Sequence, residues 1–170
     1  MKLALTLITL LISSLLFAQN RTSPDEVATN AGSLTVQPIT HGSVVLNWKD
    51  QNIFVDPYGG GERYEGLANP TLILITDIHG DHLNKNTLDA LNTGEATLVV
   101  PQAVMDQLPE NLKAKAKVLG NGQELTINGL AIQAIPMYNL PEDETSRHTK
   151  GRGNGYVLTI GGKKVYLSGD

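Results

Sequence analysis

The stretch that decides the fold of this chain covers residues 71–82 and reads Thr71-Leu72-Ile73-Leu74-Ile75-Thr76-Asp77-Ile78-His79-Gly80-Asp81-His82. Its first five residues form an apolar run directly after Pro70, which predicts a buried strand. The polar residues that follow predict a loop that opens into a helix. Four side chains that can bind a metal therefore lie within six residues at the end of a strand: Asp77, His79, Asp81 and His82.

These side chains favour a particular class of metal. Imidazole and carboxylate groups together suit divalent Zn²⁺, Mn²⁺ or Fe²⁺. The alternative is a polar loop in which Asp81 caps a helix and the histidines lie on the surface. We favour the metal site, because the chain has only four histidines and two of them are in this segment.

The segment resembles the His-x-His-x-Asp-His signature of the metallo-β-lactamase fold superfamily, with Asp77 at the position of the first histidine. The resemblance covers residues 34–170 and implies an α/β (α+β) fold with four layers, α/β/β/α. The superfamily continues beyond this point with further strands, helices and a last histidine, so we expect the second half to be incomplete. Residues 136–139, 148–151 and 155–157 are similar to the branch that contains L-ascorbate-6-phosphate lactonase-like and uncharacterised hydrolases.

Asp77 is the clearest departure from the superfamily pattern. A carboxylate at this position keeps an oxygen ligand but makes the site harder and more negative, which favours Mn²⁺ or Fe²⁺ over Zn²⁺. Alternatively, Asp77 orients a neighbouring ligand without touching the metal. The sequence leaves both possibilities open.

The resemblance also implies the other metal ligands. Asp77, His79 and His148 would hold one metal, Asp81 and His82 would hold a second, and Asp170 would bridge the two. His148 lies in a polar loop expected over residues 139–153, where the alternative is a plain surface histidine. Asp170 is the last residue, and its alternative is a frayed, solvated terminus.

Two more residues at strand ends match the same branch. The resemblance implies a substrate contact for His41 and support of a metal ligand for Asp56. A hydrogen-bonded structural histidine is an equal alternative for His41, and Asp56-Pro57 is also a good turn former. The glycine-rich segments 59–61 and 151–155 lack the Lys-Ser/Thr of a phosphate loop, so we expect flexible rims of the site.

The resemblance implies a metal-dependent hydrolase with one or two zinc ions, or with manganese or iron. Water held by the metals loses a proton near neutral pH, and Asp81 would orient that water or accept its proton. The expected substrate is an ester, lactone, amide or phosphoester of a small molecule. The alternative is a secreted metal-binding remnant without catalysis, which Asp77 and the missing last histidine favour.

Residues 1–18 have the features of a secretory signal peptide. Lys2 precedes an uncharged apolar run over residues 3–17, and Ala18 supplies a small residue for cleavage. The run is shorter than the ~20 residues that a spanning helix needs, which argues against the alternative of a membrane anchor. The chain has no cysteine, so lipoprotein anchoring and disulfides are excluded. We therefore expect export to a bacterial periplasm or to the outside of the cell.

The charge of the chain argues against a nucleic-acid partner. Thirteen basic and 17 acidic residues give a net charge of −4, and no basic cluster stands out. A small molecule is the expected partner, and the oligomeric state is left open.

Short strand-like segments make up most of the rest of the chain. They cover residues 34–39, 44–48, 52–55, 97–100, 115–119, 124–127, 130–135, 155–160 and 163–167. Asn128-Gly129 is the strongest two-residue hairpin turn. Helices are expected over residues 84–91 and 101–108, and residues 19–33 are expected to be a flexible lead-in.

Overall fold

The structure, a computed structural model, describes residues 21–170 as two β-sheets with short helices. The expected signal peptide, residues 1–18, lies outside the described residues. The first sheet has seven strands in chain order: β1 (Asp25–Thr29), β2 (Gly32–Thr40), β3 (Ser43–Trp48), β4 (Gln51–Val55), β5 (Leu72–Leu74), β6 (Thr97–Val100) and β7 (Ala116–Val118). The second has four, in the order β11 (Lys163–Leu167), β10 (Gly153–Ile160), β9 (Leu130–Met137) and β8 (Glu124–Ile127).

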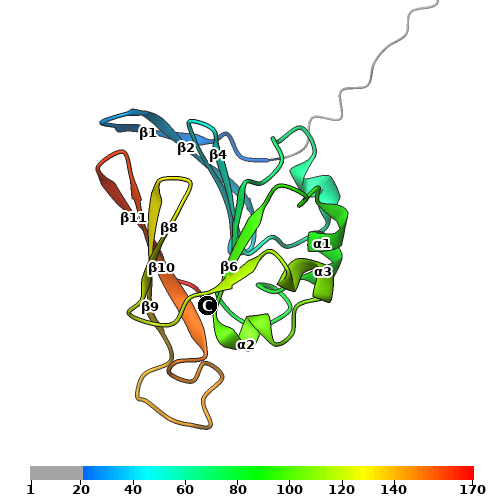
Figure 1. Ribbon diagram of the computed structural model, residues 1–170, viewed down its shortest axis with the longest axis vertical. Coiled ribbons are helices and arrows are strands. Elements are labelled where there is room, and N and C mark those ends of the chain that lie inside the picture. The colour runs from blue at the N-terminus through cyan, green and yellow to red at the C-terminus, as the bar shows by residue number, and fades with distance from the viewer. Residues whose placement is uncertain (1–20) are drawn as a thin grey trace, which may run out of the picture.

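The two sheets pack face to face, and the helices cover the outer face of the first sheet (Figure 1). They are η1 (Gly61–Tyr64), α1 (Lys85–Ala90), α2 (Gln102–Met105) and α3 (Glu110–Lys113). Within residues 21–170 no helix follows β8, so the second sheet has no helical layer of its own. The described residues thus form three of the four expected layers, and the α/β class is confirmed.

Alternation along the central strands explains the two apolar layers. Leu72 and Leu74 face the second sheet, whereas Ile73 and Ile75 face the helices, and all four are fully buried. Successive side chains of a strand point to opposite faces, so a strand covered on both sides is apolar throughout. This is why residues 71–75 form a continuous apolar run.

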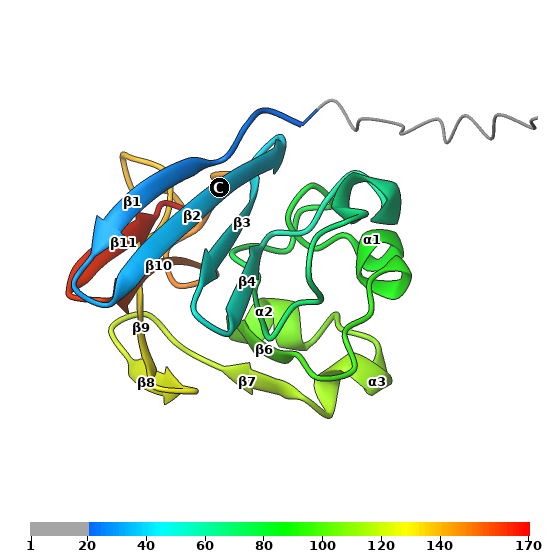
Figure 2. The same cartoon turned by 90° about the horizontal axis from the view of Figure 1, so that it is seen from above.

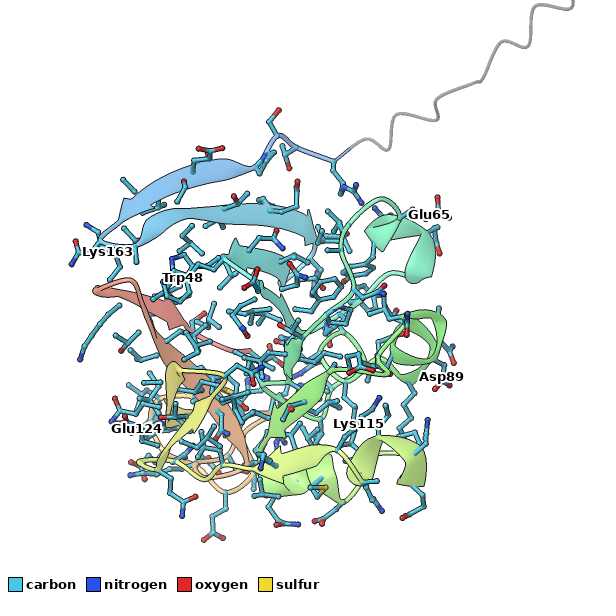
Figure 3. All side chains as sticks on the ribbon, turned by 45° about the horizontal axis from the view of Figure 1, so that its top comes forward. Trp48, Glu65, Asp89, Lys115, Glu124 and Lys163 are labelled. Carbon is cyan, nitrogen blue, oxygen red and sulfur yellow. The ribbon has the colours of Figure 1, made fainter. Side chains whose placement is uncertain are left out.

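Side chains from both sheets fill the space between them (Figure 3). Trp48 lies at the same end of this layer as Lys163, the first residue of β11 (Figure 3). Its indole Nε1 donates to the hydroxyl of Thr29 over 3.3 Å.

A change in strand direction creates the edge on which the site is built. Strands β1 to β4 pair in antiparallel fashion, whereas β4 to β7 are parallel. The carboxyl ends of β4 and β5 therefore lie at the same edge of the sheet. Asp56 follows β4, and the loop with Asp77 and His79 follows β5. Loops on such an edge are a common place for functional residues.

The second sheet confirms the hairpin expected at Asn128-Gly129 and contains another at Gly161-Gly162. Asn128 and Gly129 have φ angles of 49° and 79°, as a two-residue turn with positive φ requires, and Gly161-Gly162 makes the turn between β10 and β11. The loop over residues 138–152 joins β9 to β10, whose ends pair at Met137 and Gly153.

The expectation of a flexible lead-in over residues 19–33 is wrong for part of this segment. Residues 25–29 form β1, which pairs with β2. Its residues are exposed except for the partly buried Thr29, so the strand has no apolar alternation to reveal it. Seen from above, β1 and β2 extend across β10 and β11 (Figure 2), and the Asn30 amide donates to the Gly161 carbonyl over 2.8 Å.

The expected helices differ slightly from the observed ones. Helix α1 is confirmed within residues 84–91, and the side chain of Asn84 caps it by accepting from the Thr87 amide. The helix expected over residues 101–108 is the shorter α2, and α3 follows it. No helix within residues 21–170 is long and apolar enough to span a membrane.

Tyr156 ties the second sheet to the strand that leads into the site. Its fully buried hydroxyl donates to the carbonyls of Ile75 and Val99, 2.9 and 3.3 Å away. Burial raises the pKa of Tyr156 well above its ordinary value, so the hydroxyl stays a donor.

Replacing Tyr156 by phenylalanine removes the hydroxyl, so the buried carbonyl groups of Ile75 and Val99 lose this hydrogen-bond donor. We expect Tyr156→Phe to lower the free energy of unfolding by about 1–3 kcal/mol. Urea unfolding monitored by the fluorescence of Trp48 measures the change. The control is Tyr166→Phe, at a side chain that is 62% exposed, which should change stability by less than about 0.5 kcal/mol. Equal losses in the two variants would contradict the role of Tyr156.

Candidate metal centre

Residues from three distant segments converge at the carboxyl edge of the first sheet. Asp77 and His79 come from the loop after β5, His148 comes from the loop over residues 138–152, and Asp170 follows β11. One potential ligand atom from each of these four residues lies within 4.8 Å of the others. The structure therefore brings together four of the residues expected to bind a metal.

The carboxylate of Asp170 lies at the middle of this cluster. Its Oδ2 is 2.7 Å from His79 Nδ1, 2.8 Å from His148 Nε2 and 3.5 Å from His82 Nε2. Partial burial works against the ionised form, but the hydrogen bond from His79 and the charge of His82 oppose it, and the pKa of Asp170 lies well below its ordinary value. Asp170 is thus a carboxylate that faces three imidazoles.

Gly169 allows Asp170 to reach this position. Its φ angle is +80°, and a Cβ atom there would lie 2.9 Å from the carbonyl oxygen of Asn154. A side chain would therefore be strained and would clash with the start of β10.

The geometry of His148 fits a metal. Asn139 Oδ1 accepts from the backbone amide of His148 over 3.1 Å and lies 2.9 Å from its Nδ1. The amide contact identifies this Asn139 atom as an oxygen, which can accept a hydrogen bond but cannot donate one. His148 Nδ1 must therefore be the donor and carry the proton. In the neutral ring this leaves a lone pair on Nε2. Nε2 is buried and has no hydrogen-bond partner within residues 21–170, although Asp170 Oδ2 lies 2.8 Å away. A lone pair and a carboxylate oxygen this close are stabilised by a cation between them.

Asp77 is fully buried and holds an ion pair that the sequence did not predict. Arg152 Nε donates to Asp77 Oδ1 over 3.1 Å, and Nη2 donates to Oδ2 over 3.0 Å. The same Oδ2 lies 2.9 Å from His79 Nδ1 and so also faces the cluster. Asp77 is therefore both a candidate ligand and the partner of a cation.

The second group of expected ligands lies beside the first. His82 Nε2 points toward Asp170 Oδ2 and lies 4.0 Å from Asp81 Oδ2. Its other nitrogen, Nδ1, is 2.8 Å from Asp56 Oδ2. Asp56 also accepts from the amide and hydroxyl of Thr76, over 2.8 and 2.6 Å, which holds this carboxylate in place.

Asp56 sets the protonation of His82. Burial disfavours a charged ring, but the hydrogen bond and charge of Asp56 outweigh it and raise the pKa of His82 to about 9. Binding of a metal at Nε2 therefore has to release a proton. An imidazole whose far nitrogen is held by a carboxylate is a common arrangement around protein-bound metals.

His41 lies at the outer edge of this group. Its Nε2 is 2.9 Å from Asp81 Oδ2, and its side chain is 56% exposed. Slight burial raises the pKa of Asp81, but hydrogen bonds from the backbone amide of Asp81 and from His41 outweigh it. The pKa of Asp81 therefore lies below its ordinary value. Thus all the expected site residues lie in one region, while the role expected of each stays a prediction.

Three residues that line the site were not expected from the sequence: Thr76, Asn139 and Arg152. Segment 151–155 was predicted to be a flexible rim, but Arg152 is anchored to Asp77 and β10 begins at Gly153. The sequence did contain two hints of this ion pair. Arg152 is a charged residue between two glycines near His148, and Asp77 is an acidic residue after a fully apolar strand that needs a cationic partner.

Comparison with known proteins agrees with this fold and geometry. The family described as the beta-lactamase superfamily domain matches residues 35–170. The chain belongs to the metallo-β-lactamase superfamily. The resemblance seen in the signature at residues 77–82 is thereby confirmed.

Individual members of the superfamily are similar to most of the chain. A UPF0173 metal-dependent hydrolase of Thermococcus onnurineus is 30% identical over 125 residues, which cover 71% of this chain and 54% of the relative. A candidate metal-dependent hydrolase from Parabacteroides distasonis, solved as a crystal structure, is 33% identical with a TM-score of 0.76 and covers 87% of this chain and 66% of its own. Igni18, a metallo hydrolase of Ignicoccus hospitalis, shares the fold at 19% identity with a TM-score of 0.63, over 81% of this chain and 60% of its own. The chain thus spans about half the length of the curated relatives that it matches.

The contact between Asp56 and His82 gives a test of the second group of ligands. Asp56→Asn keeps the shape of the side chain but removes the charge that orients His82. We expect a second equivalent of Zn²⁺ to bind about 10–100-fold more weakly, while the first equivalent is unaffected. Competition with a chromophoric chelator measures both equivalents. Asp50→Asn, in the exposed turn between β3 and β4, should change neither, and an unchanged second equivalent in Asp56→Asn would contradict the assignment.

Proposed function

We propose that this chain is a metal-dependent hydrolase that acts on an ester, lactone, amide or phosphoester of a small molecule. The observation that carries the proposal is the meeting of His79, His148 and Asp170, with the Nε2 lone pair of His148 facing a carboxylate. The names of the relatives, which are metal-dependent hydrolases, support the same activity.

The residues present fit one or two divalent metals, with zinc, manganese and iron as candidates. Asp77, His79, His148 and Asp170 would hold the first metal, and Asp81, His82 and Asp170 would hold the second. When bound, such a metal acts as a Lewis acid that lowers the pKa of water and polarises the carbonyl or phosphoryl group under attack.

Asp81 and His41 are the groups that would move the proton. The lowered pKa of Asp81 keeps its carboxylate ionised, so it can orient a water molecule and accept a proton from it. His41 Nε2 shares a hydrogen bond with Asp81 Oδ2, and its exposed ring can contact the substrate or pass the proton to the leaving group. The two residues come from different loops and form one acid–base pair.

A cavity beside His148 provides room for a small molecule. It has a volume of about 400 Å³ and is formed by the loop between β9 and β10. Its lining is largely polar and includes Asn139, Glu142, Asp143 and Lys150. Such a cavity favours a polar substrate. Because the chain has no basic cluster, a small molecule suits it better than a nucleic acid.

The second candidate is a secreted metal-binding protein without catalysis. The aspartate in place of the first histidine favours it, because an altered site can bind a metal without turnover. Metal content and activity separate the candidates. Two equivalents with hydrolysis indicate the enzyme, whereas one equivalent without hydrolysis indicates a binding protein. In either case we propose export, on the basis of the features of residues 1–18.

The test uses the chain from residue 19 onward, loaded with Zn²⁺, Mn²⁺ or Fe²⁺ and assayed on esters, lactones, amides and phosphodiesters. Removal of the metal by a chelator should abolish hydrolysis, and return of the metal should restore it. Asp81→Asn should lower the rate about 10²–10⁴-fold because the proton acceptor is lost.

The control is Asp89→Asn, an exposed position of α1, which should hydrolyse at the native rate. Hydrolysis that survives both chelation and the loss of Asp81 would show that the metal site does not carry the activity.

A further inference from the structure

The pair formed by Asp77 and Arg152 is not explained by a generic metal site. A neutral imidazole at position 77 would add no charge to the cluster, whereas aspartate adds a full negative charge at a fully buried position. A buried carboxylate without a partner is strongly unfavourable. The chain supplies a partner 75 residues away in the sequence.

Arg152 holds both oxygens of Asp77 at once. The guanidinium donates through Nε and Nη2 to the two carboxylate oxygens, over 3.1 and 3.0 Å. This two-point contact fixes the orientation as well as the charge of the carboxylate, which a lysine cannot do. Arg152 is only 22% exposed, so solvent screens the pair weakly.

The backbone around Arg152 is built for this approach. The Asn154 amide donates to the Thr76 carbonyl over 2.9 Å, which fastens the start of β10 to the end of β5. A Cβ atom on Gly153 would lie 2.9 Å from the Thr76 carbonyl oxygen and 3.3 Å from Asp77 Oδ1. Only glycine therefore allows the two segments to lie this close.

The paired carboxylate can still bind a metal. A carboxylate oxygen can accept more than one partner, and Asp77 Oδ2 faces both Arg152 Nη2 and His79 Nδ1. Arg152, the residue before β10, contacts both oxygens of Asp77, and Oδ2 lies 2.9 Å from His79 Nδ1 of the cluster. Arg152 Nη2 also lies 3.5 Å from His79 Nε2, so it contacts two of the four candidate ligands in the motif, Asp77 and His79.

We propose that Asp77 and Arg152 act as a neutral pair that takes the place of a histidine ligand. Asp77 Oδ2 is the metal ligand, and Arg152 is a positioning residue that orients the carboxylate and offsets its charge. The inference rests on the proposed metal site and adds that residues 77 and 152 can be exchanged only together. The oxygen ligand also makes the site harder, so Mn²⁺ should compete with Zn²⁺ better than at a site with a third imidazole.

A double-mutant cycle tests the pair through metal affinity, without any activity measurement. The affinities for Zn²⁺ and Mn²⁺ are measured by chelator competition for the native chain, Asp77→His, Arg152→Gln and the double variant. In Asp77→His the guanidinium loses its carboxylate and adds a positive charge beside the metal, so Zn²⁺ should bind at least about tenfold more weakly. The double variant should recover most of this loss, and its preference for Zn²⁺ over Mn²⁺ should exceed the native one.

Cobalt spectra and a charge control complete the experiment. The visible spectrum of Co²⁺ bound to the native chain should differ from that of the double variant, because an oxygen ligand is replaced by nitrogen. Lys113→Gln removes a cation that pairs with Glu110 on α3, outside the metal centre, and it should leave metal affinity unchanged. Arg152→Lys keeps the positive charge but loses the two-point contact with the Asp77 carboxylate. This variant should therefore bind Zn²⁺ more weakly than the native chain. Circular dichroism establishes that each variant is folded.

The outcomes separate this inference from the proposed function. Equal Zn²⁺ affinity of the native chain and Asp77→His would overturn the pairing while leaving the hydrolase proposal intact. Binding at the first cluster that appears only in Arg152→Gln would show that the guanidinium stands in for the metal, which also overturns it. No metal binding in any variant would overturn both proposals.

Discussion

The contact between the Asp170 carboxylate and the imidazoles of His79 and His148 is the interaction on which the rest of the site depends. It joins the loop after β5, the loop between β9 and β10 and the residue that follows β11. Three features of the fold make this contact possible. Parallel pairing places the carboxyl ends of β4 and β5 at the same edge of the first sheet. The hydroxyl of Tyr156 links the second sheet to Ile75, and Gly169 adopts the left-handed backbone conformation that precedes Asp170. Together these features hold the Asp170 carboxylate beside the two imidazoles.

Much of the fold could be predicted from patterns along the chain. The apolar run at residues 71–75 predicted β5 because a strand buried on both faces needs apolar side chains throughout. Asn128-Gly129 predicted its hairpin because both residues adopt positive φ. Strand β1 could not be found in this way, because its exposed side chains show no alternation and its pairing with β2 uses the backbone.

Site residues that belong to a motif could be predicted from the sequence. Residues that only hold a motif residue through a hydrogen bond or an ion pair could not. His79 was expected from the superfamily signature, and His148 and Asp170 were expected from the wider resemblance to the superfamily; the structure brings the three together. Arg152 and Asn139 have no motif of their own, and their importance comes from the buried charge of Asp77 and the ring nitrogen of His148. Such partners become visible only when the burial and hydrogen bonds of the motif residues are known.

Anomalous diffraction from crystals of the zinc-loaded chain tests the central claim most directly. The account predicts a peak at the zinc edge between Asp77 Oδ2, His79 Nδ1, His148 Nε2 and Asp170 Oδ2, at about 2.0–2.2 Å from each ligand atom. A peak bounded by other residues, or His148 Nε2 turned away from the ion, would contradict it.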